Sequence, residues 1–279
     1  MRKFEYSSSD FKKAEAPKYK LAIQFGKLEY GYTIYSIALK KFVFVKFNPF
    51  PNEEESLTEK LNYVFGKEPL IKLNYHSTAF LYLSTKATLI PENLFTEESK
   101  TTFFAYNHFL SETEIVLSNK IEHSDIVNVF SFPEKAKAIL ASNLTNYKIY
   151  HQYTSFVESA LLSSANNQKT KEIYLNIDND FFNICATQSN NLLFNNSFEY
   201  QTIDDFIYYV HLTLKNLNIT DNSTPIILSG NISTKVGTYK ILKRFFKNVK
   251  FKDNFPKAAF SKELKLDKHY FDNLIYITV

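Results

Sequence analysis

Glycine is scarce in this chain of 279 residues, which contains only five of them. They stand at positions 26, 31, 66, 230 and 237, and they form no Gly-x-Gly-x-x-Gly or Gly-Lys-Ser/Thr pattern. Loops that hold phosphates need glycine, because their backbone must approach the anion closely and often takes positive φ. The sequence therefore excludes dinucleotide-binding folds and P-loop NTPases.

Cysteine and long apolar runs are also lacking. The one cysteine, Cys185, excludes an intrachain disulfide and a thiolate metal site. No window of 18 residues is apolar and free of charge, so we expect no membrane-spanning helix. The first residues run into Ser and Asp instead of an apolar segment, and no signal peptide is predicted. We therefore expect a cytoplasmic protein.

Arginine is rare, since only two of the 33 basic residues are arginine, Arg2 and Arg244. Arginine recognises guanine and phosphate through paired hydrogen bonds, so its rarity disfavours sequence-specific nucleic-acid binding. The charge is nonetheless uneven. Between residues 235 and 268 eleven basic residues stand against three acidic ones, a net charge of +8, which leaves −4 for the rest of the chain. This asymmetry predicts a surface for an acidic partner.

The apolar pattern indicates an α/β fold with mixed sheets, in which one order of elements occurs twice. In the first half it predicts strands over 20–25, 32–39 and 42–47, a helix over 53–65 and a strand over 70–75. In the second half it predicts strands over 172–177, 181–187 and 192–198, a helix from Thr202, a strand over 225–229, a helix over 233–247 and a strand over 249–251. Between the two sets lie predicted strands over 114–117 and 126–130 and helices over 133–140 and 152–164.

The polar segment 166–170 is the predicted boundary between the two halves. We therefore expect a polar and frayed N-terminal segment over 1–18, a first lobe over 19–168 and a second lobe over 169–279. Three strands, a helix, a strand and a helix are the order of the RNase H-like domain, so the chain is predicted to contain two such lobes in tandem.

The basic residues of the predicted helix 233–247 recur at a spacing that places them on one exposed stripe. The predicted partner face consists of Lys240, Lys243, Arg244, Lys247, Lys250 and Lys252. Such a stripe is either a solvated helix face or a docking site for an acidic protein or an RNA backbone, with Tyr239, Phe251 and Tyr270 available for stacking. Phosphate contacts from lysine would bind RNA without regard to its sequence.

Other catalytic chemistry finds little support. The six histidines form no His-x-His or His-Glu-x-x-His pattern, and no Gly-x-Ser-x-Gly elbow is present. Cys185 lies in an apolar strand, which is typical of a small buried residue. The opening strand of the first lobe has no acidic residue for a two-metal nuclease centre. We predict no catalytic residue and no metal ligand.

Two RNase H-like lobes in tandem resemble the actin-like ATPase superfamily. The segments 88–95 (TLIPENLF) and 127–133 (VNVFSFP) resemble a bacterial domain family of unknown function with that fold. The resemblance covers about residues 18–279. It implies ATP bound between the lobes, two β-turns whose amides hold phosphates, and a Gly-Gly pair that contacts the adenosine.

Each of these nucleotide elements lacks part of the superfamily pattern. The first turn would be Gln24-Phe25-Gly26, where Gln replaces the usual Asp. The second would be Asp178-Asn179-Asp180, which no Gly follows; it could hold Mg²⁺ through waters, or be a plain polar turn. The adenosine pair would be Gly230-Asn231 after Ser229.

Three functions remain open at this point. The first is a degenerate, non-catalytic actin-like module that binds a protein partner or acts as a scaffold. The second is an ATPase switch that binds Mg-ATP between the lobes, which the incomplete turns disfavour. The third is an RNA- or ribosome-associated protein that uses the basic face. We favour the first. Whether the chain is an enzyme stays open, and the missing glycines of the nucleotide turns weigh against it.

Overall fold

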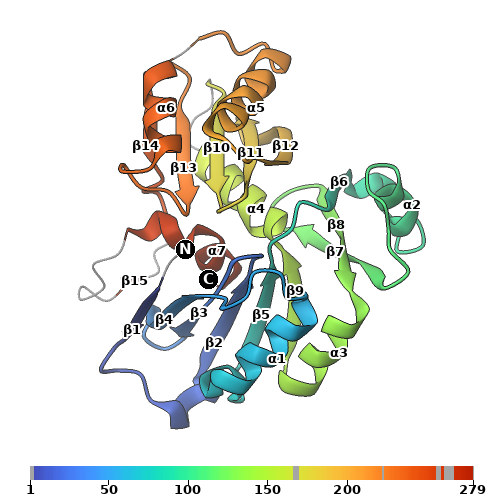
Figure 1. Ribbon diagram of the computed structural model, residues 1–279, viewed down its shortest axis with the longest axis vertical. Helices are drawn as coiled ribbons and strands as arrows, with labels where there is room; N and C mark the ends of the chain where they lie inside the picture. Colours follow the sequence, from blue (N-terminus) through green and yellow to red (C-terminus); the bar gives the residue numbers. More distant parts are fainter. Residues whose placement is uncertain (1–2, 166–169, 222, 256–258, 261–266, 279) are drawn as a thin grey trace. The chain divides into compact units, whose positions relative to one another are not determined.

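The computed structural model describes residues 3–165, 170–221, 223–255, 259–260 and 267–278. Most of the predicted boundary loop 166–170 lies outside these residues. The chain divides into two compact units (Figure 1). Unit 1 comprises residues 1–155, 257–265 and 277–279, and unit 2 comprises residues 156–256 and 266–276. The chain passes between the units four times; the first passage lies inside helix α4 (Gln152–Ser164) and the last inside helix α7 (Asp272–Thr278).

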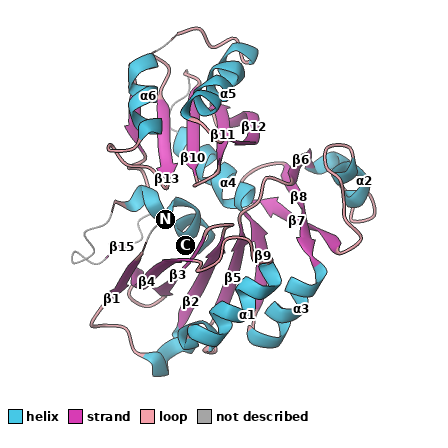
Figure 2. Cartoon of the chain, viewed as in Figure 1, coloured by secondary structure: helices cyan, strands magenta, loops and turns pink. Residues whose placement is uncertain are grey.

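Unit 1 is built on a mixed sheet. Its central strands are β4 (Lys41–Pro49), β3 (Glu29–Ser36), β2 (Tyr19–Phe25), β5 (Ser77–Tyr82) and β9 (Tyr147–His151), in that spatial order. Helices α1 (Leu57–Lys67) and α3 (Glu134–Asn143) lie side by side against one face (Figure 2). Leu61 and Val64 of α1 and Leu140 of α3 bury their side chains there in the main core of the unit.

Two short strands extend this sheet beyond β4. Strand β1 (Phe4–Ser7) pairs with β4 in antiparallel fashion, and β15 (Ala259–Phe260) pairs with it in parallel. The N-terminal segment was expected to be frayed, and this expectation is wrong: residues 4–7 are a sheet strand, and a 3₁₀ helix over Lys13–Lys18 follows. The apolar rings of Phe4 and Tyr6 alternate with exposed neighbours, which suits a strand at the edge of a sheet.

A small subdomain is inserted between β5 and β9. It consists of a three-stranded sheet in the order β6 (Ala87–Pro91), β8 (Ile126–Pro133) and β7 (Glu114–Ile121), and it is covered by α2 (Lys100–Ala105). Phe104 of α2 is fully buried against Val116 and Val129 of this sheet. The predicted strands over 114–117 and 126–130 are confirmed and are longer than expected.

Unit 2 repeats the five-stranded order of unit 1. Its sheet runs β12 (Asn191–Glu199), β11 (Phe181–Gln188), β10 (Glu172–Ile177), β13 (Ile226–Gly230) and β14 (Val249–Phe251). Helices α5 (Ile203–Asn216) and α6 (Gly237–Phe245) cover one face, and α4 packs Phe156 and Ala160 on the other. In both units the strands therefore follow the order third, second, first, fourth, fifth, which confirms the predicted duplication of an RNase H-like lobe.

The predicted strand over 70–75 is wrong. Pro69–Lys72 form a 3₁₀ helix, and the strand that joins the sheet is β5, which starts at Ser77. Pro69 favours a turn because its ring fixes φ near the helical range. Ile71 and Tyr75, which produced the apolar pattern, instead bury their side chains in the core beside α1.

Helix starts follow local hydrogen bonding. Ser56 accepts from the backbone N–H of Glu59 while the Glu59 carboxylate accepts from Ser56, so α1 begins at Leu57 and not among the three glutamates before it. Thr202 and Asp205 form the same capping box and start α5, as predicted. Helix α6 is shorter than expected, since it begins at Gly237 and ends at Phe245.

None of the helices within the described ranges is long and apolar enough to cross a membrane.

Candidate functional site

The acidic turn of unit 2 connects β10 to β11. The backbone N–H of Asp178 donates to the carbonyl of Phe181 over 2.9 Å, which closes the turn. The carboxylate of Asp178 accepts from the backbone N–H of Asn179 at 2.8 Å and from its side-chain amide at 3.2 Å. Residues 178–180 therefore lie in a turn outside the strands, and Asp178 bonds to the backbone of its own turn.

The loop that follows β13 approaches the backbone of β10 closely. Gly230 has a φ of +85°, and a Cβ there would lie 2.3 Å from the carbonyl oxygen of Ile177. The backbone N–H of Asn231 donates to that same carbonyl at 2.6 Å. The hydroxyl of Ser229, the residue before Gly230, accepts a hydrogen bond from the side-chain amide of Asn176 at 2.8 Å. Glycine is needed at 230 because of backbone conformation and packing.

The predicted turn and the predicted adenosine pair meet in unit 2. The side-chain amide of Asn231 donates to the side-chain carbonyl of Asn179 at 2.8 Å. The sequence placed Asp178, Asn179 and Asp180 in one element and Ser229, Gly230 and Asn231 in another, without a predicted contact. The parallel pairing of β10 with β13, in which Ile177 lies opposite Gly230, explains why they are neighbours.

The turn is electrically negative. Tyr200 donates its hydroxyl to the carbonyl of Asp178 at 3.1 Å, and its backbone N–H donates to the carbonyl of Asp180 at 3.0 Å. Burial, followed by the negative charges of Asp178 and Asp180, raises the pKa of Tyr200 to about 12. Within the described parts of the chain no three acidic, His or Cys side chains are grouped so as to hold a metal ion. A magnesium ion here would need water for most of its ligands.

The first predicted turn, over residues 24–26, belongs to unit 1. Gln24 is the penultimate residue of β2 and is buried. The backbone N–H of Gly26 donates to the carbonyl of Glu29 at 3.0 Å, which closes the β2–β3 connection. The turn is therefore closed by a backbone hydrogen bond, as the acidic turn is in unit 2.

The predicted basic face lies on α6, on β14 and on the loop between them, and most of it is exposed. We call this surface, which comprises Lys240, Lys243, Arg244, Lys247 and Lys250, the α6 basic surface. No ion pair joins any of these five side chains to an acidic residue in the regions that the structure describes. The Arg244 guanidinium lies 5.8 Å from the ring centre of Phe245, which is 44% exposed.

Lys252 was assigned to the same face, and this prediction is wrong. Its side chain is 3% exposed and its ammonium group lies 3.1 Å from the carboxylate of Asp272. The ammonium group also donates to the hydroxyl of Ser159 in α4. Strand β14 ends at Phe251, so the alternation that exposes Lys250 does not continue to Lys252. Burial lowers the pKa of Lys252, and Asp272 opposes that shift.

The aromatic residues beside the α6 basic surface stack on one another. Tyr239 and Phe251 have ring centres 5.3 Å apart and an interplanar angle of 3°. Phe251 lies 4.4 Å from the ring of His269, which in turn lies 4.3 Å from Tyr270. These are the rings that the sequence offered for base stacking, and in the fold they are occupied by contacts within unit 2.

The comparison with protein families gives a match over most of the chain. Residues 8–249 match a family described as "Protein of unknown function (DUF3822)". The chain belongs to this family. No curated protein matches it significantly.

Solved structures place this DUF3822 member in the actin-like ATPase fold. A protein of unknown function with that fold from Bacteroides thetaiotaomicron is 25% identical, with a TM-score of 0.79 over 87% of this chain and 93% of that one. The PilM-PilN type IV pilus biogenesis complex gives a TM-score of 0.65 at 10% identity, over 92% and 97% of the two chains. The ethanolamine utilization protein EutJ from Carboxydothermus hydrogenoformans gives 0.51 at 9% identity, over 94% and 90%. The predicted family and fold are thus confirmed.

Proposed function

We propose that this protein is a cytoplasmic, non-catalytic binding module of the actin-like fold that docks an acidic protein partner on the α6 basic surface. The observation that carries this proposal is the set of five exposed cations on α6, on β14 and on the loop between them, none of which has an ion-pair partner in the described structure. A basic surface attracts an acidic partner over a Debye length and increases its rate of association.

The acidic turn of unit 2 supports a function without nucleotide turnover. A phosphate group needs free backbone N–H donors and a cation beside it. Here the N–H of Asn179 already donates to Asp178, and the N–H of Asn231 donates to Ile177. The two carboxylates of the turn would repel a triphosphate. Mg-ATP is therefore a disfavoured ligand at this turn, and turnover is not part of the proposal.

A protein partner fits the surface better than RNA does. Single-stranded RNA is held by aromatic rings that stack on its bases. The rings of Tyr239 and Phe251 stack on each other instead, at an interplanar angle of 3°. The PilM-PilN complex, a structure of the same fold, is a complex between proteins. A partner protein with clustered Asp and Glu side chains would match the lysines as simple point charges.

Charge reversal on the α6 basic surface tests the docking proposal. We expect the Lys243→Glu/Lys247→Glu variant to bind fluorescent polyglutamate at least about tenfold more weakly than the unmodified protein, and binding to fall with added salt. Lys135→Glu/Lys137→Glu on α3 makes the same charge change on exposed residues of unit 1 and serves as the control. Equal loss in both variants would show a general charge effect and contradict the proposal. Tighter binding of poly(U) than of polyglutamate would replace the protein partner with RNA.

A melting experiment tests the nucleotide alternative. We expect millimolar Mg-ATP, Mg-ADP and Mg-GTP to leave the melting temperature unchanged. A ligand present at 100 times its Kd would stabilise the protein by about 2.7 kcal/mol, which is readily detected. A shift that the Asp178→Asn variant abolishes would establish a nucleotide site at the acidic turn and overturn the non-catalytic assignment.

A further inference from the structure

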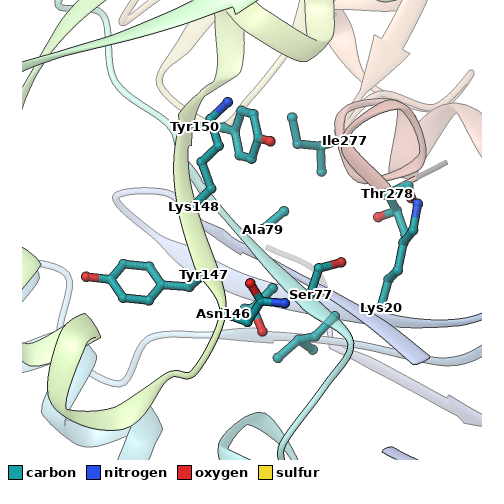
Figure 3. Close-up of a pocket in the computed structure, with 11 residues that line it drawn as sticks. Lys20, Ser77, Ala79, Asn146, Tyr147, Lys148, Tyr150, Ile277 and Thr278 are labelled. Carbon is teal, nitrogen blue, oxygen red and sulfur yellow. Dashed lines mark hydrogen bonds between the residues drawn. The ribbon is translucent and has the colours of Figure 1, made fainter. Parts of the chain in front are cut away.

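Unit 1 contains a cavity of about 270 Å³ on the face of its sheet opposite α1 and α3. Its walls come from the first residues of the three parallel strands β2, β5 and β9 and from the end of α7. Figure 3 shows Lys20 and Lys148 on opposite sides of this space, with Ser77 and Ala79 between them. Neither the predicted nucleotide residues nor the α6 basic surface contributes to it.

The cavity exists because the middle strand carries small side chains. Side chains of a strand alternate between its two faces, and Phe80 of β5 points into the core beneath the helices. Ser77 and Ala79 therefore point to the opposite face. Lys20 pairs with Ser77 across the β2–β5 ladder, and Lys148 pairs with Ala79 across the β5–β9 ladder. The two lysines thus flank a strip of small residues; their backbones are about 10 Å apart across the strands and displaced by two residues along them.

The cavity is positively charged. Two of its eleven lining residues are lysines and none is acidic. Lys20 donates one hydrogen bond, to the carbonyl of Thr278 at 2.9 Å, and an ammonium group has three donors. That contact also offsets the partial negative charge at the end of α7. Lys148 is exposed, and its ammonium group lies 4.9 Å from the ring centre of Tyr150.

A hydroxyl group completes the set of donors. The Ser77 side chain makes no hydrogen bond to any residue in the described ranges. By contrast, the side-chain amide of Asn146 at the cavity rim is already bonded to the carbonyl of His76. A ligand in the cavity would therefore meet two ammonium groups from opposite sides and one hydroxyl from the floor.

We infer that this cavity binds a small phosphate monoester. Two ammonium groups and a hydroxyl line this space, and a phosphate group, with its higher charge and its oxygens at the corners of a tetrahedron, can use more of these donors than a planar carboxylate. The volume equals that of about nine water molecules at roughly 30 Å³ each, so it holds an organic group as well as the phosphate. Tyr150 and Ile277, which line the same space, offer apolar contact to that group.

Calorimetric titration of the full-length protein tests this inference. The probes are inorganic phosphate and β-glycerophosphate, at an ionic strength held constant with chloride. We expect the Lys148→Ala variant to bind β-glycerophosphate at least about tenfold more weakly and Ser77→Ala about threefold more weakly. Lys72→Ala removes an exposed lysine of the same unit that does not line the cavity, and it should bind like the unmodified protein.

Three results would overturn the inference. The first is the absence of binding of either phosphate probe at about 10 mM. The second is an unchanged affinity in Lys148→Ala at an unchanged melting temperature. The third is equal affinity for succinate, which would indicate a carboxylate ligand. The Lys243→Glu/Lys247→Glu variant should retain phosphate binding, so this site and the docking surface fail or succeed separately.

Discussion

At the scale of single residues, two glycines should respond to alanine in opposite directions. Gly230→Ala places a Cβ 2.3 Å from the carbonyl oxygen of Ile177 on a backbone with φ of +85°, so we expect it to destabilise the protein by about 2 kcal/mol or more. Gly66 lies inside α1, with nothing within 4 Å of its added Cβ. Gly66→Ala should stabilise by about 1 kcal/mol, because alanine favours the helix. Urea denaturation measures both, and a stable Gly230→Ala variant would contradict the close approach.

His151, at the end of β9, is a histidine that burial keeps neutral. Its Nδ1 accepts from the backbone N–H of Tyr153 at 3.1 Å and from the side-chain amide of Asn128 at 3.4 Å. The proton of the neutral ring therefore sits on Nε2, which donates to the carbonyl of Ser84 at 3.0 Å. Burial lowers the pKa of His151 to about 3.

This histidine makes stability depend on pH. The unfolded chain binds a proton at His151 near pH 6.5, whereas the folded chain does so only near 3, so stability is lost as the pH falls through that window. The full loss amounts to roughly 4–5 kcal/mol. We expect His151→Gln to reduce the slope of unfolding free energy against pH between 6 and 4 by about 1.4 kcal/mol per pH unit. His123→Gln, at an exposed turn, should keep the original slope.

At the scale of elements, the sequence predicted strands where apolar residues alternate and failed where the signal lay elsewhere. Strand β5 escaped prediction because Ser77 and Ala79, which face the cavity, are small. Ile71 supplied a false signal because it fills the core from a 3₁₀ helix. The cavity between Lys20 and Lys148 was missed for a different reason. These lysines belong to β2 and β9, and both strands lie beside β5 only in the folded sheet.

Lys252 shows a second limit of local patterns. Its partner Asp272 stands twenty residues later, in α7, and its other contact, Ser159, belongs to α4. No spacing rule along the chain connects these three residues. Lys252 is therefore held by an ion pair to α7 and by a hydrogen bond to α4. The local pattern of basic residues instead predicted that it belongs to an exposed stripe.

Breaking this pair should be costly to stability. We expect Asp272→Ala to destabilise the protein by about 3–5 kcal/mol, because it leaves the buried ammonium group of Lys252 without its counter-charge. The double variant Lys252→Met/Asp272→Leu should recover most of that loss, since it removes both charges. Guanidinium denaturation provides the measurement, and Asp253→Ala, at an exposed neighbour, is the control. Equal stability of Asp272→Ala and the unmodified protein would contradict a buried pair.

At the scale of the whole molecule, the duplicated order of elements was the most predictable feature. Strand, helix and turn signals repeat in both halves, so their sequence in the chain identifies the fold even though each motif is incomplete. The site was predictable in part. The residues of the acidic turn and of the Gly230 loop were named from the resemblance to the actin-like superfamily, and their role in ligand binding stays a prediction. Their contact depends on the parallel pairing of β10 with β13, which local patterns do not predict.

Unit 2 should fold by itself. It has its own core, to which β10, β11, β13, α5 and α6 all contribute, and all of its residues lie between 156 and 276. We expect a fragment of residues 152–276 to unfold in one cooperative transition, followed by circular dichroism. Phe206→Ala, at a fully buried position, should lower the stability of the fragment and of the full chain by a similar amount, about 3–5 kcal/mol. A fragment without a cooperative transition would contradict an independent unit.

The strand β15 has a consequence for the order in which the protein is made. Its partner β4 begins at Lys41, and β15 ends at Phe260, so the ribosome must synthesise residues 156–256, the larger part of unit 2, before this pair can form. At about 5–20 residues per second, the intervening chain takes on the order of 10–45 s. During that interval the beginning of β4 lacks its pairing with β15. The sheet of unit 1 is therefore completed only late in translation.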